Sequence, residues 1–362
     1  MHEAGTQSCT PAIAPWRIGK VEPQEWLPPL AGAPWGYRRR ARLGARFVHS
    51  KGRSLVGFRE KMSSYVAEVE HCQVLRPEVG LLVGELSRMV TRLSIPMRIP
   101  QIEVAVGDAH TVLVVRVLDP ISDADRGILR EFELAHGVSF LLQAGRPDQL
   151  EAVSGEVPSL WYELPRYGLK LAFEPADFIQ VNGEMNRRLI DQVIDLLAPD
   201  EQSVVLDLFC GLGNFTLPLA TRARHVVGIE GEAGLIARAR ANAAANQLSN
   251  VDFHVADLAG EDAVERCLAL SGGRGYSHVL IDPPRTGALD VLPAIARLAP
   301  RRLAYVSCHP GSLARDLGIL VTAHGFSLRY AGIVDMFAHT SHVESVAILD
   351  GPTTTMKGSR GA

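Results

Sequence analysis

The stretch Val204–Pro218, VVLDLFCGLGNFTLP, constrains the fold of this chain more than any other. It opens with a mostly apolar run, which is typical of a fully buried strand. A glycine-rich turn, Cys210–Gly213, follows, and then a stretch compatible with a helix. A parallel strand that enters a helix through glycines lets a ligand approach the backbone, because no side chains block it. The sequence therefore predicts an α/β domain that binds a ligand at the carboxyl edge of a parallel sheet.

The type of ligand follows from the residues around this turn. The next predicted strand ends at Glu230, about 20 residues beyond the turn, where a carboxylate can accept hydrogen bonds from ribose hydroxyls. Thr216 stands where a dinucleotide site has its third glycine, and the lysine of a phosphate-binding loop is absent. Asp207 would repel a pyrophosphate but suits a cationic ligand that carries an amino acid. These features favour S-adenosylmethionine over NAD or ATP; the alternative is a tight turn without a ligand.

The rest of the chain predicts two α/β domains. After the glycine turn, strands alternate with helical stretches, which indicates a doubly wound parallel sheet. The strands are expected at 225–229, 251–255, 278–281, 302–306, 327–334 and 342–349. Before it, short strands and helices alternate in a smaller domain. The expected limits are an irregular arm or truncated element at 1–34, a basic α/β domain at 35–165, a second domain at 166–350 and a disordered tail at 351–362.

Charge and cysteine content bound the surroundings and the partners. Five cysteines without close pairing argue against a disulfide framework and, with no apolar run of membrane-spanning length and no signal-peptide pattern, predict a cytoplasmic protein. Between Trp35 and Met62 nine Lys or Arg residues stand against one acid, Glu60, and aromatic residues are interspersed. Such a segment suits phosphate contact and base stacking, so Arg38, Arg39 and Arg40 are candidate RNA contacts. The alternative is a solvated basic hairpin.

Three further groups of reactive residues follow predicted strands, at the edge where open α/β sheets bind ligands. Asp257 is placed to reach an adenine edge. Two prolines separate Asp282 from Arg285 and would hold both rigidly. Cys308 lies at a strand end beside His309 and the start of a helix, where a thiolate would be stabilised. Taken alone, a cysteine in this apolar context would more often be a buried core residue.

Six stretches in this order resemble the RNA (uracil-C5)-methyltransferase family. They are FIQVN at 178–182, LDLFCGLGNFTLPLA at 206–220, VVGIE at 226–230, DPPRTGA at 282–288, YVSCHPGSLARDL at 305–317 and DMFAHTSHVES at 335–345. With PWGYRRRARL and VSGE, the pattern is most similar to the bacterial enzymes that form 5-methyluridine in 23S ribosomal RNA. The resemblance spans roughly residues 34–350.

The resemblance implies a Rossmann-like class I S-adenosylmethionine-dependent methyltransferase domain, a parallel sheet with a reversed last strand. It implies Cys308 as the nucleophile and Glu344 as the base. The residues expected to line the cofactor and substrate pocket are Gln180, Phe209, Asn214, Glu230, Asp257 and Asp282, with Arg285 on the substrate. The chemistry asks for these types, because C5 of uracil becomes a nucleophile only after a thiolate adds to C6. The target base is expected to leave its stack.

The chain departs from the family pattern at its start. Ribosomal members carry a β-barrel RNA-binding domain and a four-cysteine iron–sulfur site, of which Cys72 matches the fourth ligand and Cys9 matches none. We therefore expect no intact 4Fe–4S cluster, either because the chain starts late or because the site is lost. No protein partner is implied, and a monomer is expected. The alternatives are a transfer RNA (uracil-C5)-methyltransferase and a non-catalytic RNA-binding or assembly factor; a small-molecule methyltransferase is disfavoured because it needs neither the basic segment nor a nucleophilic cysteine.

Overall fold

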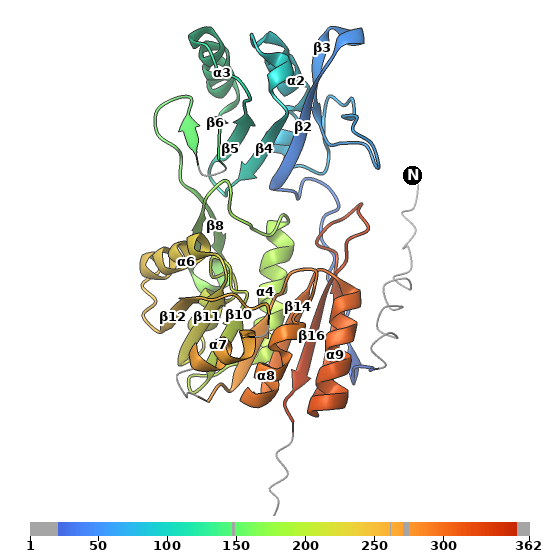
Figure 1. Ribbon diagram of the computed structural model, residues 1–362, viewed down its shortest axis with the longest axis vertical. Coiled ribbons are helices and arrows are strands. Elements are labelled where there is room, and N and C mark those ends of the chain that lie inside the picture. The colour runs from blue at the N-terminus through green and yellow to red at the C-terminus, as the bar shows by residue number, and fades with distance from the viewer. Residues whose placement is uncertain (1–20, 147–148, 261, 271–274, 353–362) are drawn as a thin grey trace, which may run out of the picture. The chain divides into compact units, whose positions relative to one another are not determined.

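The computed structural model describes residues 21–352 except 147–148, 261 and 271–274 (Figure 1). The chain forms two compact units. Unit 1 comprises residues 1–32 and 187–362, and unit 2 comprises residues 33–186. The domain limits proposed from the sequence, at 35 and 166, differ from this division because unit 2 extends through a hairpin that the sequence did not reveal.

Unit 1 is built on an eight-stranded sheet in the order β1-β15-β16-β14-β13-β10-β11-β12. Neighbouring strands are parallel except where β16 meets β14 and β15. The fold prediction, a parallel sheet with a reversed last strand, is confirmed. The strand bounds are Glu25–Trp26 (β1), Val204–Leu208 (β10), His225–Glu230 (β11), Val251–Val255 (β12), His278–Ile281 (β13), Arg302–Ser307 (β14), Ser327–Val334 (β15) and Glu344–Asp350 (β16).

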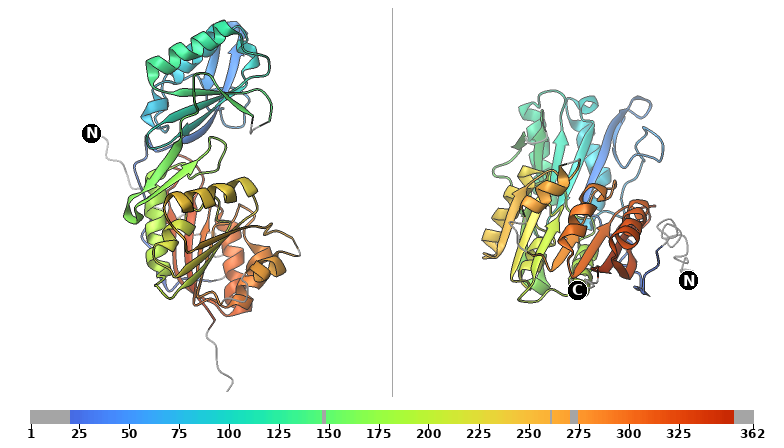
Figure 2. Two further views of the ribbon diagram at one scale, coloured as in Figure 1. Left: turned by 90° about the vertical axis from the view of Figure 1, so that its left-hand side faces the viewer. Right: turned by 60° about the horizontal axis from the view of Figure 1, so that its bottom comes forward.

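Helices cover both faces of this sheet, which explains why its strands read as continuous apolar runs. Helix α4 lies on one face and α7, α8 and α9 on the other (Figures 1 and 2). On the second face Leu206, Val279 and Leu303 pack against α8 and α9 in one buried cluster. The helix bounds are Gly183–Leu197 (α4), Thr216–Ala220 (α5), Ala233–Ala245 (α6), Ala263–Leu270 (α7), Leu292–Leu298 (α8) and Pro310–His324 (α9).

Part of the expected irregular arm is ordered structure. The two-residue strand β1 pairs with β15 in parallel, and the backbone N–H groups of Leu27 and Leu30 donate to carbonyls of Ala331 and Ile333 at 2.8 and 3.0 Å. The edge of β15 would otherwise present unpaired backbone groups, so this segment satisfies them. The expected tail, 351–362, lies outside the described residues from 353 onward.

Unit 2 contains a six-stranded sheet, β3-β2-β4-β5-β6-β7, in which only β5 and β6 are parallel. Its core includes residues of α2 and α3. A capping box at Ser122 explains where α3 begins. The strands are Arg40–Val48 (β2), Arg53–Gly57 (β3), Gln101–Val106 (β4), Thr111–Arg116 (β5), Ser139–Gln143 (β6) and Leu150–Ala152 (β7), and the helices are Pro77–Gly80 (α1), Val83–Arg92 (α2) and Asp123–His136 (α3). A separate hairpin joins Leu160–Leu164 (β8) to Leu169–Phe173 (β9). The predicted hairpin around residues 50–54 is confirmed as β2–β3.

Candidate active site

The glycine turn after β10 has the backbone conformation that a ligand-binding turn needs. Phe209, Gly211 and Gly213 all have positive φ angles, of 63°, 55° and 95°. For Phe209 this conformation is costly, and such outliers concentrate at functional sites. A Cβ built on Gly211 would have no atom within 4 Å, so the space beside the turn is open. Asn214 is half-buried in the same turn. The predicted turn is therefore accessible to a ligand.

Two carboxylates flank this turn. Asp207 is 1% exposed; its Oδ2 accepts a hydrogen bond from the hydroxyl of Thr216 at 2.6 Å, and its Oδ1 has no partner. Glu230, the last residue of β11, accepts hydrogen bonds from the backbone N–H groups of Gly211 at 3.2 Å and Glu232 at 3.1 Å. Each of its oxygens keeps capacity for one more donor. Glu230 thus braces the turn and can still bind ribose hydroxyls.

Asp257 follows β12 and is exposed, with Oδ1 accepting a hydrogen bond from the backbone of Ala259 at 2.9 Å. Its carboxylate lies at the same carboxyl edge as Glu230, because β11 and β12 are parallel neighbours. Gln180 belongs to unit 2, where its Oε1 is buried and accepts no hydrogen bond. An unpartnered amide oxygen of this kind is expected where a ligand supplies the missing donor.

The strand register brings Cys308 and Glu344 together. Ser307, the last residue of β14, is directly opposite Ser345 of the antiparallel β16. Cys308 and Glu344 are one step further along this ladder, so they are adjacent at the carboxyl edge of the parallel sheet. Cys308 is half-buried, and Glu344 is 3% exposed. The reversed strand β16 is therefore what places its first residue beside the cysteine.

The loop after β13 adds two charged residues to this site. Asp282 follows Ile281, which pairs with Tyr305 of β14, so Asp282 stands beside the end of the strand that carries Cys308. Arg285 is exposed, and its guanidinium donates to the imidazole of His342 at 3.3 Å. His342 packs edge-on against Phe337, with ring centroids 5.7 Å apart. His342 was not among the site residues predicted from the sequence, although it belongs to the stretch DMFAHTSHVES.

Three carboxyl groups of this site have strongly raised pKa values. Burial raises the pKa of Asp207 to about 8, and Asp282 and Glu230 add to the shift. Burial raises the pKa of Asp282 to about 7. Burial, followed by the charge of Asp282, raises the pKa of Glu344 to about 8. Near neutral pH the site can therefore hold protons on carboxyl groups, which suits groups that exchange protons.

The pKa of Cys308 is also raised, which corrects part of the sequence analysis. Burial raises it most, then Glu344 and Asp282, while Arg285 lowers it. His309 does not stabilise a thiolate: its Nδ1 accepts a hydrogen bond from the backbone of Ser312 at 3.1 Å and caps α9. In the protein alone the thiol form is favoured. The expectation of a thiolate stabilised by this histidine and helix was wrong, because burial and then the charges of Glu344 and Asp282 raise the pKa of Cys308.

Two of the three arginines proposed to contact RNA direct their guanidinium groups to protein acceptors within unit 2. Arg39 is 6% exposed and forms an ion pair with Asp108 at 3.0 Å. The guanidinium of Arg40 donates to the carbonyl of Pro175, and burial lowers its pKa. Arg38 is half-buried, with its guanidinium 5.6 Å from the ring centroid of Phe58. Arg39 and Arg40 are therefore poorly placed to bind RNA, since the charge of Arg39 is paired with Asp108 and the guanidinium of Arg40 is held by a backbone carbonyl.

Cys72 is the part of the expected iron–sulfur site that the structure describes. It is a free, half-buried cysteine, and Cys9 lies outside the described residues. Within the described ranges, no three His, Cys, Asp or Glu residues come together in a way that could hold a metal ion. One thiolate does not fit a four-cysteine cluster, so no step of the mechanism is derived through one. Among the described helices none is long and apolar enough to cross a membrane.

The sheet order, the open glycine turn, and Asp207 with an unpartnered buried oxygen fit S-adenosylmethionine and define a methyltransferase of the Rossmann-like class. Residues 168–351 match the tRNA (uracil-5-)-methyltransferase family. The chain is 51% identical over 91% of its length to a 23S rRNA (uracil(1939)-C(5))-methyltransferase, RlmD, of Alkalilimnicola ehrlichii, and 45% identical over 93% to RlmD of Dechloromonas aromatica. It spans 74% and 78% of these relatives. The chain belongs to the tRNA (uracil-5-)-methyltransferase family.

A solved structure supports the fold. The tRNA (uracil-54, C5)-methyltransferase of Pyrococcus abyssi, in complex with S-adenosyl-L-homocysteine, has a TM-score of 0.69 and is 21% identical, covering 93% of this chain and 81% of that one. At this identity the likeness concerns the fold alone. The chain thus has the class I methyltransferase fold, and its family and its relatives make it a methyltransferase.

The buried carboxyl groups predict how stability depends on pH. A carboxyl whose pKa is raised on folding stabilises the protein when protonated, and this contribution is lost as the pH rises through the raised value. For Asp207 the window extends from about 4 to about 8. Asp207→Asn removes this titration, so at pH 9 the variant should unfold with a free energy about 2 kcal/mol above that of wild type. Denaturant melts at pH 6 and 9 measure this; equal pH dependence in both proteins would contradict the assignment.

Proposed function

We propose that this enzyme methylates C5 of a uridine in 23S ribosomal RNA and forms 5-methyluridine through a covalent bond between Cys308 and C6. The observation that carries the proposal is the adjacency of Cys308 and Glu344, which the β14–β16 register produces. A nucleophile and a base at one site match the two demands of C5 methylation. The ribosomal substrate is inferred from the relatives at 51% and 45% identity.

S-adenosylmethionine would be held by the turn after β10, with Glu230 at the ribose, Asp257 at the adenine and Asp207, Phe209 and Asn214 around the rest; when bound it supplies a methyl group on a positively charged sulfur. The cofactor's amino-acid end suits the unpartnered oxygen of Asp207, which lacks a donor in the protein.

In the proposed reaction the thiolate of Cys308 bonds to C6, and the C5–C6 π electrons move to the ring oxygen as an enolate. The enolate carbon C5 then bonds to the methyl group as the bond between that methyl and the positively charged sulfur breaks, and the electron pair of the broken bond stays on the sulfur, which becomes neutral. Glu344 removes the C5 proton, the electron pair restores the C5–C6 double bond, and the C6–sulfur bond breaks to release the Cys308 thiolate. Asp282 and Arg285, beside Cys308, are proposed to bind the uracil ring. Burial prepares Glu344 for its role because it raises its pKa to about 8.

The direct test is methyl transfer from labelled S-adenosylmethionine to unmodified 23S ribosomal RNA and to unmodified transfer RNA, followed by nucleoside analysis. Label in 5-methyluridine of the ribosomal RNA alone is the expected result. Label in transfer RNA alone would show that the substrate is transfer RNA and not 23S ribosomal RNA. Cofactor binding without transfer to either RNA would favour a non-catalytic RNA-binding or assembly factor.

We place RNA contact in unit 2 on cations that remain exposed. Arg46, Arg59 and Lys61 are exposed, and none of them forms an ion pair within the described residues. The guanidinium of Arg46 lies 5.6 Å from the ring centroid of Tyr65, which is 65% exposed. An exposed ring beside an exposed arginine whose charge no acid of the described residues neutralises suits a stacked base and its phosphate.

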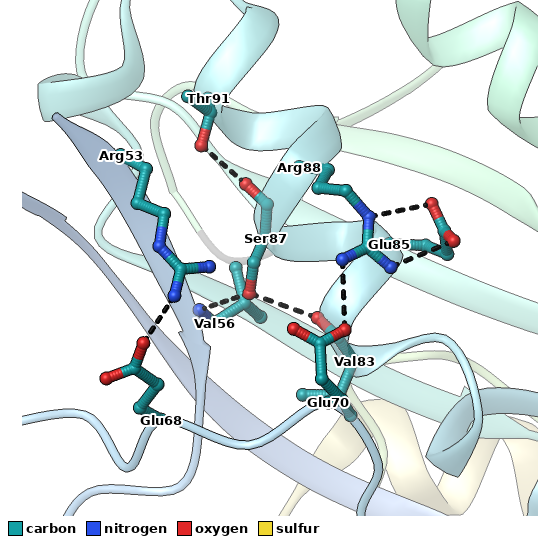
Figure 3. Close-up of polar contacts among 9 residues, drawn as sticks. All are labelled: Arg53, Val56, Glu68, Glu70, Val83, Glu85, Ser87, Arg88 and Thr91. Carbon is teal, nitrogen blue, oxygen red and sulfur yellow. Dashed lines mark hydrogen bonds and ion pairs between the residues drawn. The ribbon is translucent and has the colours of Figure 1, made fainter. Parts of the chain in front are cut away.

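Replacing Arg46, Arg59 and Lys61 together by Gln should weaken RNA binding about tenfold and lower the slope of log K against log salt by about 2, since each phosphate contact on a single strand contributes about 0.7. A matched control removes three arginines that acids already neutralise in the same unit: Arg53, Arg88 and Arg98. Arg53 pairs with Glu68 and Arg88 with Glu70 and Glu85 (Figure 3), and Arg98 pairs with Asp119. Equal losses in both triple variants would contradict the assignment.

A further inference from the structure

A buried carboxylate that the mechanism does not use lies under the catalytic edge of unit 1. Asp316, in the second turn of α9, is fully buried. Its Oδ2 accepts hydrogen bonds from the hydroxyl of Tyr305 at 2.7 Å and from the backbone N–H of Ala288 at 2.8 Å, and its Oδ1 accepts one from Nε of Arg315 at 2.8 Å. A carboxylate so deep in a protein is costly unless its oxygens are satisfied, and here they are.

These partners come from three segments that carry the proposed chemistry. Tyr305 is in β14, three residues before Cys308, and Asp316 is in the helix that follows the cysteine. Ala288 ends the loop that begins at Asp282 and contains Arg285. One carboxylate therefore joins the nucleophile's strand and helix to the loop that holds Asp282 and Arg285, two of the three charged residues that act on the nucleophile.

The loop is shaped to receive this carboxylate. Gly287 has a φ of +84°, and a Cβ on it would lie 2.6 Å from Oδ2 of Asp316 and 2.6 Å from a guanidinium nitrogen of Arg315. Any side chain there would push the loop away. Arg315 also donates to the carbonyl of Thr286 at 2.8 Å, so loop and helix are joined by two backbone contacts.

We propose that Asp316 is a positioning residue that ties the Asp282–Ala288 loop to the β14–α9 corner and thereby holds Arg285 beside Cys308. Asp282 directly follows β13, and its backbone N–H lies 3.4 Å from the carbonyl of Leu208, which anchors it to the sheet independently. Within the described part of the chain, the guanidinium of Arg285 contacts the exposed His342 and has no comparable anchor in the sheet. Loosening the loop should therefore displace the cation more than the carboxylate.

A displacement of Arg285 should change the pKa of Cys308. Burial and the carboxylates of Glu344 and Asp282 raise the pKa of Cys308, and Arg285 is the charge that lowers it. Losing Arg285 from its place removes the one charge that opposes these influences, so the pKa rises further and the thiolate fraction falls. The thiolate is the form that reacts with alkylating agents.

The test measures alkylation of Cys308 by iodoacetamide from pH 6 to 10 in the full chain, with the Cys308 peptide quantified by mass spectrometry. Asp316→Asn should move the profile to higher pH and slow alkylation at pH 8 about 3- to 10-fold. Arg285→Ala should do the same, and the double variant should add no further shift, because both changes remove one interaction. The half-buried Cys72 is the internal reference in each sample and should not change.

Two further variants keep the outcome decisive. Gly287→Ala, which displaces the loop but leaves Asp316 intact, should reproduce the shift if Asp316→Asn fails to fold. Asp350→Asn is the matched control: this carboxylate pairs with Arg302 and Arg329 at the opposite end of β14 and β16, and its loss should leave the profile unchanged. Lower melting temperatures with an unmoved Cys308 profile in both Asp316→Asn and Gly287→Ala would overturn the proposal.

The importance of Asp316 for catalysis rests on the proposed function, and separate experiments test the positioning role of Asp316 and the proposed function. Alkylation needs neither RNA nor cofactor. If the Asp316 and Arg285 variants shift the Cys308 profile as expected but the wild-type enzyme transfers no methyl group, the positioning role is supported and the proposed function is contradicted. With an active wild type, Asp316→Asn should lower kcat about 10- to 100-fold and leave the KM for S-adenosylmethionine unchanged. Methyl transfer by wild type with no change of kcat in the variant would remove the positioning role alone.

Discussion

Cys308→Ala is expected to abolish methyl transfer, with turnover at least about 1000-fold below wild type, because without the thiolate the ring carbon C5 has no route to a nucleophilic enolate. Affinity for S-adenosylmethionine should stay within about twofold, since the glycine turn after β10 and Glu230 do not involve this side chain. Equilibrium binding and single-turnover transfer measure the two effects separately.

The matched control is Cys72→Ala, which removes the other half-buried cysteine of the described chain. It should leave turnover unchanged. If Cys308→Ala keeps more than a tenth of the wild-type rate, the covalent mechanism is wrong, whatever the cofactor affinity.

Glu344→Gln is expected to trap the reaction after methyl transfer. The covalent bond to C6 can form, but no carboxylate takes the C5 proton, so turnover should fall about 100- to 10,000-fold and a protein–RNA adduct should survive denaturing electrophoresis. The wild-type rate should rise with pH through about 8, as Glu344 loses its proton, and this dependence should vanish in the variant.

The control is Glu232→Gln, which removes the charge of an exposed glutamate at the start of α6. This variant should form no lasting adduct. If the Glu344→Gln enzyme is active and forms no adduct, Glu344 is not the base. Because Glu344 is buried and its pKa is raised, the Gln variant should also be more stable than wild type above pH 8, which separates loss of the base from misfolding.

Sequence reasoning predicted the sheet of unit 1 well because its strands are short, buried on both faces and separated by clear helices. Each expected strand from Val204–Leu208 to the reversed last strand is present, with ends within about two residues. The expectation that Glu344 acts with the nucleophile came from the family resemblance, and the register of β16 against β14 explains why the two residues are adjacent. Strand β1 was missed because a two-residue strand has no period, and its partner β15 lies about 300 residues away.

The electrostatic state of the site could not be predicted from local sequence. His309 and a helix start next to Cys308 indicated a stabilised thiolate, but the pKa of Cys308 depends on its burial and then on Glu344 and Asp282, which folding brings from other segments. Arg39 turned inward for a similar reason, since Asp108 lies 69 residues away. Asp316 gave no signal, because one acid in an otherwise ordinary helix has no pattern until Tyr305 and Ala288 reach it.

The most direct measurement is to react the enzyme with S-adenosylmethionine and an RNA fragment that carries 5-fluorouridine at the methylated position, and to map any cross-link by mass spectrometry. A base cannot remove fluorine as it removes the C5 proton, so the reaction should stop with the RNA still bonded to the protein. We predict one adduct, between Cys308 and C6 of a ring that has gained the methyl group. An adduct at another cysteine, or normal uridine methylation with no adduct on the fluorinated RNA, would contradict the account.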